Sequence, residues 1–88
     1  MASYSVFLVP AAQKQIEDLE KRDRLGVLEA VGALAEEPRP RGCKRFSTLE
    51  KYRIRVGVYR VVYTIDDAVV RVVVVRVGHR RDVYRRKG

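Results

Sequence analysis

YRIRVGVYRVVYTIDD, residues 52–67, is the stretch of sequence that decides the fold. On both sides of Gly57, apolar residues alternate with other residues at a period of two, as in strands that bury one face. Strands are therefore predicted over 51–56 and 58–65. The glycine between them supplies a tight turn, so the two strands form an antiparallel hairpin.

Two further strands are predicted around this hairpin. Asp66 and Asp67 form the next turn, because aspartate side chains bond back to the local backbone. AVVRVVVVRV (68–77) is apolar on most of both faces, which predicts a strand inside the sheet. YSVFLV (4–9) is rich in β-branched and aromatic residues and predicts the first strand of the chain.

Between the first strand and the hairpin, apolar residues recur at helical spacing in two stretches. The first helix begins near Pro10, which suits a first helical turn, and KRDR (21–24) is interpreted as the turn that ends it. The second stripe, over 25–35, ends at EEP (36–38), since the residue before proline disfavours helix. The order β–α–α–β–β–β predicts a single α+β domain over 1–88, with a helical hairpin packed on one face of a small antiparallel-rich sheet.

The charge of the chain is segregated. Its formal net charge is +8, but residues 1–38 hold four basic and seven acidic side chains, whereas residues 39–88 hold fifteen basic and four acidic ones. Such a distribution is typical of a protein that binds a polyanion or an acidic partner. The apolar run 69–77 is interrupted by arginines and too short to span a bilayer, and no secretory signal is recognised. We therefore expect no membrane association and a cytoplasmic location.

Strand parity predicts where the basic side chains lie. Burying an unpaired arginine costs roughly several kcal/mol. The helices should therefore cover the face of the sheet that does not carry the arginines. That helix-covered face is expected to carry Tyr52, Ile54, Tyr59, Val61, Tyr63 and Val75. The exposed face is expected to gather Arg53, Arg55, Arg60, Arg76 and Arg80. No cluster of acids or histidines completes a metal site around Asp66 and Asp67, so no metal or cofactor is expected.

The segments 52–67 and VVRVGHRRDVYR (74–85), in this order after a helical hairpin, resemble the RelE-type toxins of the RelE/ParE superfamily. The resemblance implies a type II toxin that inhibits translation as a ribosome-dependent mRNA endonuclease. It also implies two partners: mRNA in the ribosomal A site, and an acidic RelB-like antitoxin that holds the toxin in a hetero-oligomer.

The resemblance assigns roles to individual positions. Arg60 matches the contact to the scissile phosphate, Arg80 the general acid, and Tyr84 the residue that stacks on or orients a nucleotide. Lys51 and Arg53 match two basic positions that are both lysine in the family pattern. Because arginine is almost never deprotonated, Arg53 is better suited to stabilising charge than to acting as a base. The further RNA-binding positions are Arg55, Arg76, His79, Arg81 and Arg85. For His79 a packing role competes with this one.

Without a metal, the reaction open to such a site is attack by the RNA 2′-hydroxyl on the adjacent phosphate, so DNA should not be cut. Lys51 would draw the hydroxyl proton. Two other functions stay open. One is a ParE-like inhibitor of DNA gyrase, although that branch generally lacks the set formed here by Arg60, Arg80 and Tyr84. The other is a non-catalytic basic RNA-binding module, whose binding would fall steeply with salt.

Overall fold

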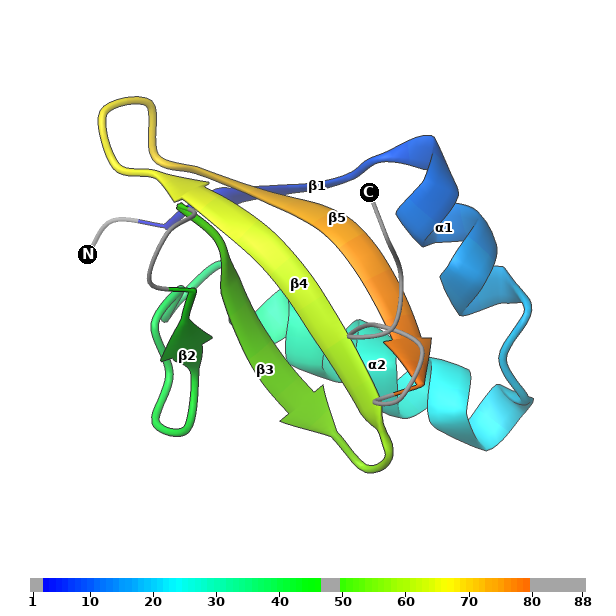
Figure 1. The fold of residues 1–88 in the computed structure, drawn as a ribbon. Helices are drawn as coiled ribbons and strands as arrows, with labels where there is room; N and C mark the ends of the chain where they lie inside the picture. Colours follow the sequence, from blue (N-terminus) through cyan, green and yellow to red (C-terminus); the bar gives the residue numbers. More distant parts are fainter. Residues whose placement is uncertain (1–2, 47–49, 80–88) are drawn as a thin grey trace.

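The computed structural model describes residues 3–46 and 50–79, in which two helices cover one face of a five-stranded sheet (Figure 1). The elements are β1 (Ser5–Leu8), α1 (Pro10–Glu17), α2 (Lys21–Ala33), β2 (Lys44–Arg45), β3 (Tyr52–Val56), β4 (Tyr59–Asp66) and β5 (Arg71–His79). Their order in the sheet is β1-β5-β4-β3-β2; β1 pairs in parallel with β5, and the other pairs are antiparallel. The predicted α+β class is confirmed, with the two-residue β2 as an addition to the expected order.

The helical hairpin turns three residues earlier than predicted. KRDR (21–24) is not a turn but the first turn of α2, and the break lies at Asp18–Glu20, where Glu20 has an extended backbone. The Arg24 N–H donates to the Glu20 carbonyl at 2.8 Å, which opens the helical ladder. Asp23 lies in this first turn, where a negative charge complements the helix dipole. The prediction was wrong because four consecutive charged residues at a helix start carry no apolar spacing.

The core lies between the helices and the inner face of the sheet. Ala12 and Ile16 of α1 and Val27, Val31 and Leu34 of the α2 segment are buried there. The strands contribute the buried side chains Ile54, Val61, Tyr63, Val72, Val74 and Val77. In the described part of the chain, no helix is long and apolar enough to cross a membrane.

Candidate nucleic-acid interface

Two rows of side chains cross the sheet on the face away from the helices. In an antiparallel pair, residues directly opposite each other point to the same side. Arg53 of β3 is opposite Val62 of β4, which is opposite Arg76 of β5. In the next row Arg55 is opposite Arg60, and Gly78 completes the row. Their neighbours Ile54, Val61 and Val77 form the buried row on the other face.

The four arginines of these rows, Arg53, Arg55, Arg60 and Arg76, are called the arginine face below. Neighbouring strands lie about 5 Å apart, so this face brings four guanidinium groups from three strands within reach of one short nucleic-acid segment. Arg55 and Arg60 are directly opposite each other, an arrangement of like charges that destabilises a sheet. Arg60 is half-buried and its Nε atom is shielded from solvent. The placement of these four side chains on the face opposite the helices agrees with strand parity.

A β-bulge in β5 explains why Val74 and Val77 both face the core while Arg76 lies on the opposite face. Val62 is opposite Arg76, whereas the next residue, Tyr63, is opposite Val74, so Val75 is an extra residue. The bulge reverses the alternation: Val74 faces the core before it and Val77 faces the core after it. The prediction that Val75 packs against the helices was therefore wrong. A bulge adds one residue to one strand and re-aims the side chains beyond it.

Lys44 joins the same side of the sheet, which was not anticipated. It is opposite Arg53 in the short β2–β3 pairing, so it extends the first row by one cation. Two adjacent exposed basic residues carry no apolar alternation, and periodicity gives no strand signal there. The sequence signal that could have indicated Lys44 was the basic loop that precedes it, which lies close in sequence to the predicted site residues.

The other predicted site residues are distributed differently. Lys51 is half-buried and immediately precedes β3, where its carbonyl accepts the Phe46 N–H at 2.9 Å. His79, at the end of β5, is opposite Tyr59 and on the helix side, with ring centroids 6.1 Å apart and an edge-on geometry. The structure therefore does not bring His79 together with the arginine face. The predicted residues Arg80, Arg81, Tyr84 and Arg85 lie outside the described residues.

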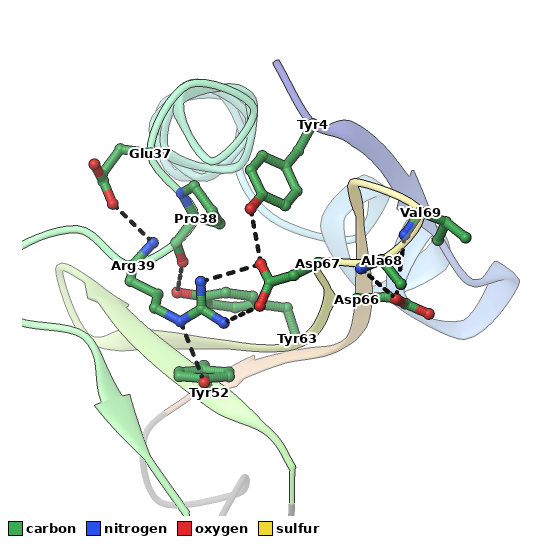
Figure 2. Close-up of polar contacts among 10 residues, drawn as sticks. All are labelled: Tyr4, Glu37, Pro38, Arg39, Tyr52, Tyr63, Asp66, Asp67, Ala68 and Val69. Atoms are coloured by element: carbon green, nitrogen blue, oxygen red, sulfur yellow. Dashed lines mark hydrogen bonds and ion pairs between the residues drawn. The ribbon is translucent and has the colours of Figure 1, made fainter. Parts of the chain in front are cut away.

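A network of an ion pair and hydrogen bonds links the start of β3 to the loop after α2 (Figure 2). Arg39, in the loop after α2, donates through two nitrogens to the Asp67 carboxylate, at 2.9 and 3.3 Å. Tyr4 donates to the same carboxylate at 2.7 Å. These hydrogen bonds from Arg39 and Tyr4 hold the pKa of Asp67 below its ordinary value. The network joins the chain before β1 to the turn between β4 and β5.

The network continues from Arg39 into two stacked tyrosine rings. Arg39 Nε donates to the Tyr52 hydroxyl at 3.3 Å, and its guanidinium carbon lies 5.3 Å from the centre of the Tyr52 ring. Tyr52 stacks on Tyr63 with ring centroids 5.9 Å apart. The buried Tyr63 hydroxyl donates to the Pro38 carbonyl at 2.8 Å, and burial is the main cause that raises its pKa. Tyr52 lies directly between Lys51 and Arg53 in sequence, so the network fixes the start of β3.

The chemistry that this arrangement offers is binding of negative charge. Guanidinium groups donate several hydrogen bonds in a fixed fork that matches phosphate oxygens. Among residues 3–46 and 50–79, no three His, Cys, Asp or Glu side chains gather to hold a metal ion. The described residues thus favour contacts to phosphate groups through arginine and lysine.

Comparison with known proteins gives one consistent group of relatives. The family model described as the ParE toxin of the type II toxin–antitoxin system parDE matches residues 6–84. The toxin RelG of Mycobacterium tuberculosis is 38% identical over 85 residues, which cover 94% of this chain and 98% of RelG.

Several solved structures share the fold. The archaeal RelE–RelB complex from Pyrococcus horikoshii matches with a TM-score of 0.80 and 25% identity, over 89% of this chain and 96% of that one. The toxin–antitoxin complex RelBE2 from M. tuberculosis matches with a TM-score of 0.77 and 35% identity, over 90% and 93%. The isolated RelE toxin of E. coli matches with a TM-score of 0.77 and 25% identity, over 94% and 98%.

Proposed function

This chain belongs to the RelE/ParE family of type II toxins, as a RelE-type toxin, and from that premise we propose that it is an endoribonuclease that cleaves mRNA on the ribosome. Cleavage of the mRNA would inhibit translation. The arginine face carries this proposal, because it gathers positive charge from three strands on the face of the sheet that the helices leave open.

The cost of the arginine face supports a functional role. Arg55 directly opposite Arg60 destabilises the sheet, since like charges across an antiparallel pair repel. A phosphate oxygen placed between the two guanidinium groups would turn this repulsion into attraction on both sides. An RNA backbone, which carries one such charge per nucleotide, fits a face with this spacing of cations.

The reaction that suits these residues needs only the RNA and the protein. The 2′-hydroxyl oxygen attacks the adjacent phosphorus and the P–O5′ bond breaks, leaving a cyclic phosphate and a free 5′-hydroxyl. Lys51 accepts the proton of the 2′-hydroxyl, while Arg53 and Arg60 stabilise the charge that grows on the phosphoryl oxygens. One such donor is worth about 3–4 kcal/mol in the transition state. Arg80 stabilises or protonates the leaving oxygen, and Tyr84 stacks on a base.

The remaining proposed contacts concern partners. Arg55, Arg76, Arg81 and Arg85 bind the RNA backbone, and His79 contacts RNA from the rim of the site. Two of the similar structures are complexes, the RelBE2 toxin–antitoxin complex and the archaeal RelE–RelB complex, which supports a cognate acidic antitoxin for this chain and a hetero-oligomer that we expect in the cytoplasm. The ribosomal A site would present the mRNA.

The test is inducible expression in bacterial cells, with growth and RNA ends as readouts. The wild-type protein should arrest growth and leave transcripts with 5′-hydroxyl ends. Arg60→Ala should lower cleavage by about 100-fold or more, whereas Arg22→Ala, an exposed position on α2, should cleave normally. Loss of folding in Arg60→Ala, checked by circular dichroism, would show that Arg60 is structural rather than functional.

The matching family model, described as a ParE toxin, favours a second candidate function. A ParE-like gyrase inhibitor would arrest growth with a DNA-damage response and intact transcripts. RNA binding that falls steeply with salt, together with intact transcripts and normal growth, would instead identify a non-catalytic binding module.

A further inference from the structure

Phe7 places an aromatic ring on the same side of the sheet as the arginine face. Its neighbours Val6 and Leu8 in β1 pack against the core, and side chains alternate along a strand, so Phe7 points away from the helices. It is aligned with Val73 of β5, and it is 51% exposed. An exposed ring therefore lies at the β1 edge of the sheet, on the side that the helices leave open (Figure 1).

The tyrosines of the described strands lie on the helix side instead. Tyr63 is buried in the core, Tyr52 stacks on it, and Tyr59 contacts His79 on the helix side. Within the described strands, Phe7 is thus the one aromatic residue that shares a face with the arginines. Aromatic rings are the surfaces on which the bases of single-stranded RNA stack, so Phe7 adds to this face a kind of contact that the arginine face lacks.

Arg71 holds a positive charge next to this ring. It begins β5, two residues before the one aligned with Phe7, so its side chain lies on the same face. Its guanidinium carbon is 5.4 Å from the centre of the Phe7 ring. Asp66 is directly opposite Arg71, but its carboxylate accepts the N–H groups of Ala68 and Val69 in the following turn. Because Arg71 is exposed, its N–H groups can bond to a phosphate beside a base that lies on the ring.

The ring is close enough to the arginine face for one RNA strand to contact both. Val73 and Arg76 lie on the same face of β5 and are three residues apart, which corresponds to about 10 Å along a strand. The row that contains Phe7 continues with Val73 and Thr64, whose side chains are short. A strand with a phosphate bound at Arg76 can therefore continue toward β1 and place an unpaired base on Phe7.

We propose that Phe7 and Arg71 form a stacking site for an unpaired base of the RNA strand that the arginine face binds. The base stacks on the Phe7 ring, and Arg71 pairs with the phosphate of the same nucleotide. Since every base has a π-face, the site accepts any base and contributes affinity rather than sequence specificity. This inference rests on the proposed function, because it requires RNA phosphates on the arginine face.

The test measures binding of the full-length chain to a short, unstructured 2′-O-methyl RNA at low salt, by fluorescence anisotropy. Methylation blocks the attacking hydroxyl, so the RNA stays intact. Phe7→Ala deletes the ring and Phe7→Trp keeps an aromatic surface. Leu28→Ala is the matched control, because Leu28 is also an exposed apolar residue but lies on α2. Thermal melts verify that each variant folds.

A second set of RNAs tests the same contact without changing the protein. Each carries a single abasic nucleotide, at successive positions of the strand. One abasic position should weaken binding to the wild-type chain but should not weaken binding to Phe7→Ala any further, because base and ring are the two partners of one contact.

Phe7→Ala should weaken binding by about fivefold or more, whereas Phe7→Trp and Leu28→Ala should stay within about twofold of wild type. Arg71→Gln should reduce the slope of log affinity against log salt concentration by about 0.7, the value for one phosphate contact to a single strand. Arg22→Gln, at an exposed position on α2, should leave this slope unchanged.

Wild-type affinity of Phe7→Ala, or abasic losses that are equal in wild type and Phe7→Ala at every position, would overturn the stacking site and leave the proposed function intact. A Phe7→Ala variant that binds RNA normally but no longer binds the acidic protein encoded by the neighbouring gene would overturn it in favour of a protein contact. If Arg60→Ala binds the RNA as tightly as wild type, the arginine face is not the RNA site, and the proposed function fails together with this inference.

Discussion

Reversing the charge of Arg55 should raise stability while it weakens RNA binding. Arg55 is exposed and directly opposite Arg60 on the adjacent strand. Arg55→Glu replaces a repulsive cross-strand pair by an attractive one. Opposite charges in such positions contribute about 0.2–1 kcal/mol, and like charges cost a similar amount, so the change is worth roughly 0.5–2 kcal/mol of unfolding free energy.

For a domain of this size, that gain corresponds to a rise in melting temperature of roughly 2–16 °C at low ionic strength. Added salt should reduce it, because screening weakens interactions between charges near the surface. The assay is thermal unfolding followed by circular dichroism at two salt concentrations. Arg22→Glu on α2 changes the net charge equally and should leave the melting temperature nearly unchanged.

RNA binding should move in the opposite direction. Loss of one phosphate contact should reduce the slope of log affinity against log salt concentration by about 0.7 for single-stranded RNA, which fluorescence anisotropy can measure. Arg55→Glu that lowers the melting temperature would refute the cross-strand pairing of the two arginines. A variant that gains stability but binds RNA like wild type would remove Arg55 from the RNA site.

Three further changes test the framework around the site. Tyr63→Phe deletes a buried hydrogen bond to the Pro38 carbonyl and should cost about 1–2 kcal/mol in urea unfolding; an unchanged midpoint would show that this bond is not needed. Because Arg39 lowers the pKa of Asp67, the pair stabilises the fold above the ordinary pKa of aspartate, and this stability is lost as the pH falls through the lowered value. Asp67→Asn should therefore flatten acid unfolding curves in that range, and identical curves would contradict this. Deletion of Val75 removes the extra residue and leaves Val74, Arg76 and Val77 in regular alternation opposite Tyr63, Val62 and Val61, so the deletion variant should still fold, as circular dichroism and a cooperative thermal melt would show; a deletion variant that fails to fold would refute the assignment of Val75 as the bulged residue.

The sequence predicts most of the sheet because strand periodicity is strong where apolar and basic residues alternate. The hairpin around Gly57 and the resemblance to RelE-type toxins are both confirmed. The bulge was not predictable, since a run of valines offers the same side chain in either phase. Arg76 was placed on the correct side only because burying its charge is costly.

The candidate site was predictable in part. Arg53, Arg55 and Arg60 lie on two strands whose phase is clear from sequence, and they share one face. Lys44 was missed because two residues are too few to show a period. The functional roles of all the predicted site residues stay predictions, and Arg80, Arg81, Tyr84 and Arg85 also lie outside the described residues.

The parallel pairing of β1 with β5 has a consequence for the biogenesis of the protein. Ser5 is aligned with Arg71 and Leu8 with Val74. β1 therefore cannot form this pairing until β5, the last strand of the described residues, has been synthesised. Pairings this distant in sequence slow folding, because a long loop must close before they contribute. We therefore expect the native sheet to form only after β5 has left the ribosome, so the arginine face is not assembled before that point of synthesis.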